Sequence, residues 1–252
     1  MEALKVEGLT KNFGGVQALQ DVSFKVEAGE RVAIIGPNGA GKTTLFNLLD
    51  GQLTPTEGLI YFYGKNITHL PTHRRVHLGQ SRSFQITSLF PTLTILENCL
   101  LALQGTRSSK FQMFRLLTSY GNLFSKAQNL LEMVHLWEKR GDLVRNISHG
   151  EQRRLEIAIS LASEPKLLLL DEPSAGLTVV ESAAVVDMIH NLGKDITVLM
   201  VAHDMDLVFG VAERIIVLHY GQIIVEGASE EIRNDPRVKE IYMGIAESAA
   251  KC

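Results

Sequence analysis

Apolar and polar residues alternate along several early segments of the chain. The alternation covers residues 3–10 and 19–27, and Leu59–Lys65 shows it again before a turn. A period of two places one face of a strand against a core and the other toward solvent. These segments predict half-buried antiparallel strands that form a small β-subdomain.

The periodicity becomes helical from about residue 92 to residue 164. Apolar residues three and four positions apart predict one buried helix face, and here they are Leu93, Ile95, Leu96, Leu100, Leu101 and Leu103. The stretch 104–125 is polar, basic and less regular, and we interpret it as a loop-plus-helix insertion. A helix is predicted over 127–137.

Short apolar runs alternate with amphipathic stretches after Pro165. Such alternation is typical of a parallel sheet with covering helices. We predict alternating strands and helices at 167–170, 180–192, 197–202, 207–211 and 215–218, then a hairpin at 221–227 and a helix at 229–233.

Length, charge and cysteine content narrow the class of protein. The 252 residues suit one large domain or two packed subdomains, and a net charge of −3 gives no support to a nucleic-acid partner. Cys99 and Cys252 lie far apart, so they predict no disulfide framework or zinc site and fit a reducing compartment. We expect no signal peptide, and no apolar run approaches the ~18 residues that span a bilayer. Any membrane role would come through a partner.

A glycine-rich loop lies between an expected strand, Arg31–Ile35, and an expected helix, Thr44–Leu49. This order is typical of a nucleotide P-loop, whose N–H groups and helix N-terminus favour an anion. The alternative is a glycine-rich turn with a chance lysine. We predict that Lys42 reaches the terminal phosphates and that Thr43 holds Mg²⁺. The predicted nucleotide-binding residues are Gly36, Pro37, Asn38, Gly39, Ala40, Gly41, Lys42, Thr43 and Thr44. The predicted fold is α/β: a P-loop NTPase core with a mostly parallel central sheet, an antiparallel β-subdomain and an inserted α-helical subdomain.

Two acids follow the leucine run 167–170. Parallel strands deliver ligand-binding residues at their carboxyl ends. Asp171 is therefore predicted to contact Mg²⁺, directly or through water, and Glu172 to act as a general base or to orient the attacking water. A surface turn that merely contains acids is the alternative.

A second anion-binding pattern lies before this strand. Ser-x-Gly-x-Gln, starting at Ser148, precedes a basic amphipathic helix, and a helix N-terminus favours anions. Ser148 with Glu151 is also a capping box, and both interpretations can hold together. With the acidic strand that follows, the pattern resembles the signature motif of ATP-binding-cassette (ABC) ATPases.

The resemblance implies a shared ATP site. Two chains sandwich two ATP molecules in this family, and the signature of one faces the γ-phosphate held by the other. In this chain the signature residues are Ser148, His149, Gly150 and Glu151. The resemblance also matches Phe13 to an aromatic stacked on adenine, Gln85 to a glutamine that touches Mg²⁺, and His203 to a histidine near the γ-phosphate and water. Alone, Phe13 would be equally well explained as a core residue, and His203 would be better explained as a structural residue.

The family pattern therefore gives each group a role. The implied cofactors are ATP and Mg²⁺. The implied catalytic residues are Lys42, Glu172 and His203, and the implied metal ligands are Thr43, Gln85 and Asp171.

The resemblance covers about residues 3–244, which we expect to form one cassette domain. Residues 3–85 and 165–244 would form the core and β-subdomain, 86–164 the helical subdomain, and 245–252 a flexible tail. Details such as the Phe-Gly-Gly-Val start and the long segment from Leu103 to Asn146 resemble the ATP-binding subunits of branched-chain amino-acid importers. Importers of urea or amides and a lipopolysaccharide-export ATPase are near relatives.

This subfamily implies definite partners. They are an identical or paralogous second cassette, integral membrane permeases and, indirectly, a substrate-binding protein, and the expected location is the cytoplasmic face of the membrane. Alternatives of another class are a soluble, non-transport ABC ATPase and a non-enzymatic nucleotide-binding regulator.

Four positions depart from the family pattern. His149 stands where a glycine is common, and Glu151 replaces the usual glutamine. Ile159 stands where an arginine is common on the signature helix. Thr178 replaces an Asp or Asn that bridges to the opposite P-loop, which bears on dimer coupling.

Overall fold

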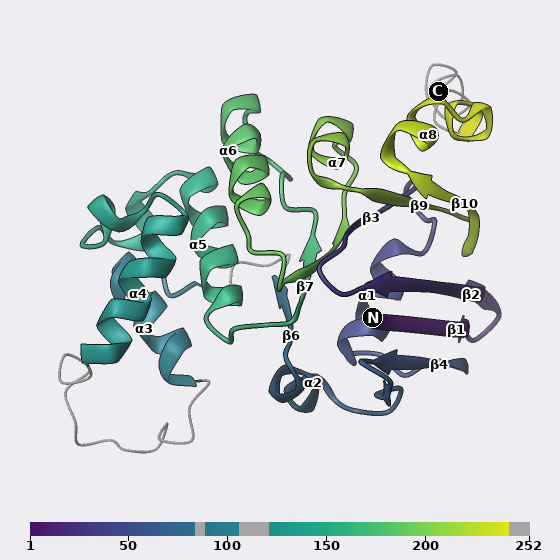
Figure 1. The fold of residues 1–252 in the computed structure, drawn as a ribbon, viewed down its shortest axis with the longest axis horizontal. Coiled ribbons are helices and arrows are strands. Elements are labelled where there is room, and N and C mark those ends of the chain that lie inside the picture. Colours follow the sequence, from purple (N-terminus) through teal and green to yellow (C-terminus); the bar gives the residue numbers. More distant parts are fainter. Residues whose placement is uncertain (84–88, 106–120, 242–252) are drawn as a thin grey trace.

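The organising feature of the structure is a six-stranded sheet in the order β10-β9-β3-β8-β7-β6 (Figure 1). In this computed structural model, which describes residues 1–83, 89–105 and 121–241, neighbouring strands are parallel except for the β9–β10 pair. The strands are β3 Arg31–Ile35, β6 Gln80–Ser83, β7 Leu167–Asp171, β8 Thr197–Val201, β9 Arg214–His219 and β10 Gln222–Ala228. The predicted mostly parallel central sheet and its closing hairpin are confirmed.

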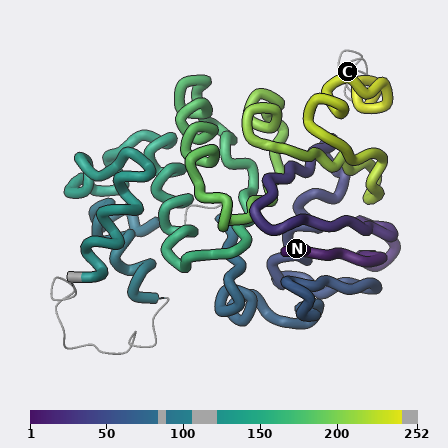
Figure 2. The backbone as a smooth tube through the Cα atoms, viewed as in Figure 1, coloured from purple at the N-terminus to yellow at the C-terminus, as the bar shows by residue number. Residues whose placement is uncertain are grey.

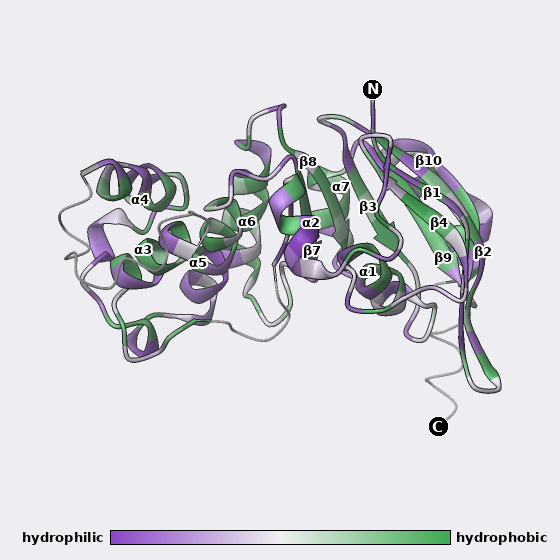
Figure 3. Cartoon of the chain, turned by 90° about the horizontal axis from the view of Figure 1, so that it is seen from below, coloured by the Kyte–Doolittle hydropathy of each residue, from purple (hydrophilic) through white to green (hydrophobic). Residues whose placement is uncertain are grey.

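A second, antiparallel sheet packs over one face of the first. Its order is β2-β1-β4-β5, with β1 Glu2–Phe13, β2 Val16–Glu27, β4 Glu57–Phe62 and β5 Lys65–Asn66. Its strands carry hydrophobic and hydrophilic residues in turn (Figure 3), which confirms the predicted β-subdomain. Helix α1, Lys42–Asp50, contributes Leu45, Phe46 and Leu49 to the same core.

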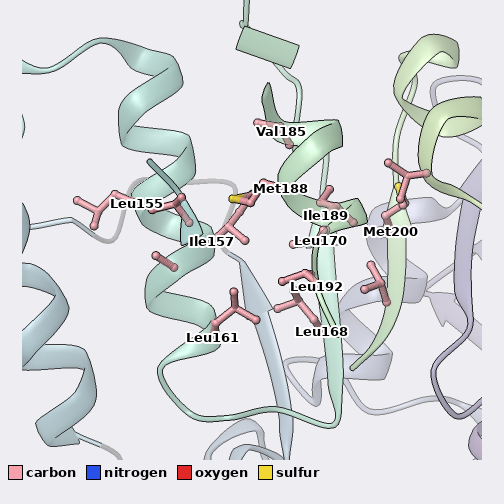
Figure 4. Close-up of a cluster of buried hydrophobic side chains, with 14 of the residues drawn as sticks. Leu155, Ile157, Leu161, Leu168, Leu170, Val185, Met188, Ile189, Leu192 and Met200 are labelled. Carbon is pink, nitrogen blue, oxygen red and sulfur yellow. The ribbon is translucent and has the colours of Figure 1, made fainter. Parts of the chain in front are cut away.

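The opposite face of the central sheet is covered by helices. These are α5 His149–Leu161, α6 Val179–His190 and α7 Met205–Val211. Successive leucines of β7 point to opposite faces, so that Leu168 and Leu170 pack with α5 and α6 (Figure 4). Leu167 and Leu169 belong to the core on the other side. A strand buried on both faces needs this continuous apolar run.

Helices α3, Ile95–Gly105, and α4, Gly121–Met133, lie at the end of the molecule remote from β1 and β2 (Figure 2). The predicted helix over 127–137 is wrong at both ends. His135 has a φ of 54° and ends the helix, because its N–H donates to Glu132 O while the N–H of Leu136 donates to Leu131 O. This is a Schellman motif with histidine where glycine is usual. The stretch 104–125, which we interpreted as a loop-plus-helix insertion, lies largely outside the described residues.

Short elements complete the chain. The 3₁₀ turns η2, Trp137–Lys139, and η3, Val144–Asn146, lead into α5, and α8, Ser229–Asn234, matches the helix predicted near the C-terminus. The expected tail lies outside the described residues. No helix within the described ranges has the length and apolar character needed to cross a membrane.

The segment that joins the two sheets was not predicted. It contains α2, Thr72–Leu78, and the polar strand β6. Arg75, 1% exposed, donates to the carbonyls of Leu48, Leu49, Thr68 and Leu70. The C-terminal carbonyls of α1 are therefore bonded to a buried cation, which also complements the helix dipole.

Candidate nucleotide site

The loop 36–41 joins β3 to α1 and is pressed against two other strands. A Cβ atom on Gly36 would lie 2.1 Å from the carbonyl oxygen of Leu218 in β9. A Cβ atom on Gly41, where φ is 102°, would lie 2.7 Å from the carbonyl oxygen of Ala18 in β2. Only glycine fits at these two positions. The predicted strand, loop and helix are confirmed, and Thr43 and Thr44 lie in the first turn of α1.

Lys42 is buried beneath this loop. Its ammonium group donates to Gly36 O at 2.7 Å and to Pro37 O at 2.9 Å. Burial lowers the pKa of Lys42, while the negative charges of Glu172 and Asp171 act in the opposite direction. The charges of the two acids therefore act on the lysine, although they lie far from it in the sequence.

A hollow of about 340 Å³ opens over the loop. It is lined by residues 36–40 together with His203, His219 and Tyr220. Sequence reasoning missed His219 and Tyr220, although they follow the same rule as Asp171, because β9 ends there beside β3. Their rings lie 4.2 Å apart, and 82% of Tyr220 is exposed.

The carboxylate of Asp171 is almost fully buried at the end of β7. Its Oδ2 accepts a hydrogen bond from Arg82 Nη2 at 2.6 Å, and Arg82 Nη1 donates to Asn47 Oδ1 at 2.8 Å. The arginine thus connects β7 to β6 and α1. Arg82 was also missed, because a polar strand such as β6 gives no periodic signal.

Glu172 and His203 face each other at the ends of neighbouring strands. His203 Nδ1 lies 3.6 Å from Glu172 Oε1, and the two side chains are 59% and 27% exposed, in that order. Glu172 has a left-handed backbone with φ 47°, and its N–H donates to Val201 O at 2.8 Å. Such a conformation is costly for a residue with a Cβ atom and is common at functional sites. The two residues stand next to each other, His203 in the lining of the hollow over the loop and Glu172 in the lining of another hollow beside Arg153.

The signature segment begins helix α5. Ser148 Oγ accepts from the N–H of Glu151 at 3.2 Å, and Glu151 Oε2 accepts from the N–H of Ser148 at 2.9 Å. The capping box is therefore present. Glu151 also binds Lys139 at 2.5 Å.

A carboxylate of the same chain already lies at this helix N-terminus. Glu181 Oε1 accepts from Ser148 Oγ at 3.1 Å and from the N–H of Gly150 at 3.3 Å. Its Oε2 accepts from Thr178 Oγ1 at 2.9 Å and from the Thr178 N–H at 3.1 Å. The bonds from Thr178 are the main reason that the pKa of Glu181 lies below its usual value, so this group is anionic at neutral pH.

The positions that depart from the family pattern have clear local partners. Thr178 is the N-cap of α6 and forms a capping box with Glu181. His149 lies beside Gly176, where an added Cβ would come within 3.4 Å of its ring. Ile159 packs against the apolar core.

Phe13 lies at the end of β1, in a long β1–β2 hairpin (Figure 3). The residue is 47% exposed, and Lys11 Nζ lies 5.1 Å from the centre of its ring. An exposed phenylalanine at a strand end is not a core residue. It does not line the hollow over the loop. Gln85 lies outside the described residues.

Comparisons with known proteins match most of the chain. The family described as "ABC transporter" matches residues 19–175, and that described as "Branched-chain amino acid ATP-binding cassette transporter" matches residues 222–247. The high-affinity branched-chain amino acid transport ATP-binding protein BraF of Pseudomonas aeruginosa is 39% identical over 250 residues, covering 96% of this chain and 98% of BraF. The lipopolysaccharide export system ATP-binding protein LptB of Acidithiobacillus ferridurans is 34% identical, covering 96% of this chain and 97% of LptB.

Solved structures agree with these matches. An ATP-binding cassette of an ABC transporter in its ADP conformation has a TM-score of 0.87 at 33% identity, covering 97% of this chain and 99% of that one. A dimeric cassette bound to ADP and Pi has a TM-score of 0.75 at 28% identity, covering 90% and 98%.

The chain belongs to the ABC transporter family. Its fold is that of the ATP-binding cassette, and it is an ATPase subunit of a transporter. Within the family, the similarity to ATP-binding subunits of branched-chain amino acid transport extends over nearly the whole chain.

Proposed function

We propose that the loop 36–44 binds the phosphates of MgATP and that Glu172 and His203 position the water that attacks the γ-phosphorus. The observation that carries this proposal is the 3.6 Å approach of His203 Nδ1 to Glu172 Oε1, in the same electrostatic environment as Lys42. Water attacks, the bond to ADP breaks, and Glu172 accepts the proton. Positioning and charge, with little covalent chemistry, supply the catalysis.

Lys42 is proposed to exchange its bonds to the loop carbonyls for bonds to phosphate oxygens. Its ammonium is held 2.7 Å from Gly36 O, so a small displacement redirects it.

Phe13 is proposed to stack on adenine, because an exposed ring gains contact area when a base covers it.

The oxygen donors of Asp171, at the end of β7, and of Thr43, in the first turn of α1, are of the kind that suits magnesium. A carboxylate and a hydroxyl are the oxygen ligands that Mg²⁺ prefers. We propose that Thr43, Asp171 and Gln85 hold the ion. Arg82 binds the Asp171 carboxylate through Oδ2 and so orients it. Bound there, the ion supplies positive charge to the phosphates.

The signature residues are proposed to act on the ATP of a second cassette. Ser148 Oγ and the N–H of Gly150 are donors at a helix N-terminus and already bind a carboxylate. A γ-phosphate presents the same kind of anionic oxygen. His149 and Glu151 are proposed to border that site.

The proposed transport role is branched-chain amino acid import. The match of residues 222–247 to the branched-chain family favours this substrate class over lipopolysaccharide export. The proposed partners are a second cassette and permeases at the cytoplasmic face of the membrane. Residues 85–103 are proposed to form the groove that receives a permease helix. We further propose residues 3–85 and 165–244 as core and 86–164 as helical subdomain.

Glu172→Gln tests the chemistry. The variant should bind ATP normally, while turnover falls about 100-fold or more because the general base is lost. Glu226→Gln, an exposed carboxylate on β10, is the matched control and should keep turnover. Near-normal hydrolysis by Glu172→Gln would remove Glu172 from the base role.

Two further measurements test the assembly. A site formed by two chains requires turnover per chain to rise with protein concentration, and a constant value would contradict the shared site. Purification from native membranes should recover permeases and a second cassette. The associated binding protein should then bind leucine, isoleucine or valine. Binding of urea or of an amide by that protein would overturn the substrate assignment.

A further inference from the structure

The side chain of Arg153 joins helix α5 to the loop that carries Glu172. Arg153 is 7% exposed. Its Nη2 donates to Asp171 O at 2.5 Å and to Glu172 O at 2.8 Å, and its Nε donates to Pro173 O at 3.2 Å. One guanidinium group therefore binds three consecutive backbone carbonyls.

The backbone held in this way is the strained one. Glu172 has a φ of 47°, a conformation that a residue with a Cβ atom adopts only when its surroundings enforce it. Its N–H is bonded to Val201 O on one side, and its carbonyl is bonded to Arg153 on the other. These two bonds fix the peptide groups on both sides of the Cα atom and thereby the direction of the side chain toward His203.

A buried ion pair orients the arginine. Glu156 Oε2 lies 2.8 Å from Arg153 Nη1, one turn further along α5. The carboxylate compensates the buried charge of the guanidinium. The planar fork of arginine then directs its remaining donors toward the loop.

The join between the start of α5 and the Glu172 loop is polar. Beside the guanidinium lies a hollow of about 330 Å³ lined by His149, Gln152, Arg153, Glu156, Glu172, Ala175 and Gly176. Apolar packing of α5 lies on its other residues: Ile157 and Leu161 face β7 and α6, and Leu155 is buried on the other side of the helix (Figure 4). Removal of the Arg153 side chain should therefore leave the helix in place, whereas the carbonyls of Asp171, Glu172 and Pro173 each lose a hydrogen bond.

We propose that Arg153 is a positioning residue that holds the catalytic glutamate in its left-handed conformation and links it to the Ser148–Gly150 end of α5. This inference rests on the proposed role of Glu172. Arg153 lies just over one turn from the cap of the helix, so a shift of that end reaches the Glu172 carbonyl through a single side chain. Closure of a second cassette on the signature is in this way communicated to the glutamate that serves the chain's own ATP.

Arg153→Gln and Arg153→Lys test the inference. Both should lower kcat about 10- to 100-fold, as expected when a reacting group is misplaced, and leave the KM and Kd for ATP within about twofold. Lysine keeps the charge but not the fork, so it should not restore kcat. Arg154→Gln is the matched control, because Arg154 donates to Val134 O and His135 O, away from the loop.

The deciding measurement is the double variant. In the Glu172→Gln background, Arg153→Gln should cause no further loss of residual turnover, since it acts through Glu172. A further 10-fold loss there, or an unchanged kcat in both single Arg153 variants, would overturn the inference. The role of Glu172 itself fails separately, if Glu172→Gln alone keeps near-normal turnover.

Discussion

The carboxylate of Glu181 accepts a hydrogen bond from the hydroxyl of Ser148, at 3.1 Å, at the N-terminus of the signature helix. The two residues are 33 positions apart, and the contact joins the start of α6 to the start of α5. An anionic group of the chain itself thus uses donors that are proposed to bind the phosphate of a partner's ATP.

Glu181→Gln should strengthen ATP-dependent dimerisation. Glutamine can still cap α6, but it removes a negative charge that competes with phosphate. We expect the dimer dissociation constant to fall a few-fold, in keeping with a single charge at a helix end. Sedimentation of Glu172→Gln chains with and without the second substitution measures this. Glu97→Gln is the control, since Glu97 caps α3 in the same way with Thr94. An unchanged constant would show that Glu181 does not compete.

Lys42→Ala should weaken ATP binding about 10- to 100-fold. A charge-assisted hydrogen bond contributes about 1.5–3 kcal/mol, and the ammonium group is positioned at the loop. Titration calorimetry with MgATP measures the loss. Retained tight binding would contradict the assignment of this loop as the phosphate site.

Phe13→Ala should raise the KM for ATP about 5- to 100-fold, since a stacked base contributes roughly 1–3 kcal/mol. Phe13→Tyr should preserve it. Val16, paired with Phe13 in the β1–β2 hairpin and 68% exposed, offers the control Val16→Ala. Equal effects of the two alanine variants would mean that only the hairpin has been disturbed.

The thiol of Cys99 should not react in the folded chain. It is fully buried, and burial raises its pKa to about 12, so the reactive thiolate is scarce at about pH 8. A Cys252→Ser variant leaves this one thiol. It should react with an aromatic disulfide reagent only after denaturant is added, and rapid labelling of the native chain would contradict the burial.

The parts of the fold that sequence reasoning predicted are those with local signals. The leucine run of β7 must be buried on both faces, and its acids must then appear at the ligand-binding edge. The glycines at 36 and 41 are required by close backbone contacts. Although the glycine contacts reach distant strands, the residue type that they require stands at the position itself, so both constraints leave a visible pattern in the sequence.

The parts that were missed depend on contacts between distant residues. Glu181, Arg82 and Arg153 are ordinary polar residues until the fold brings each against its partner. The end of α4 was misplaced because His135 adopts a left-handed conformation without a glycine signal. Helix α2 and strand β6 carry few apolar residues, since their buried side chains are polar and bonded to α1.

Arg75 and Gln80 both donate to the carbonyl of Leu49, so the rear end of α1 is anchored to the segment that leads toward residue 85. Because the C-terminal end of α1 is held in this way, the helix should not shift when an anion binds at its N-terminus. Any rearrangement on nucleotide binding should then leave α1 itself in place. The helix that carries Lys42 and Thr43 therefore serves as a fixed support for the phosphate loop at its N-terminal end.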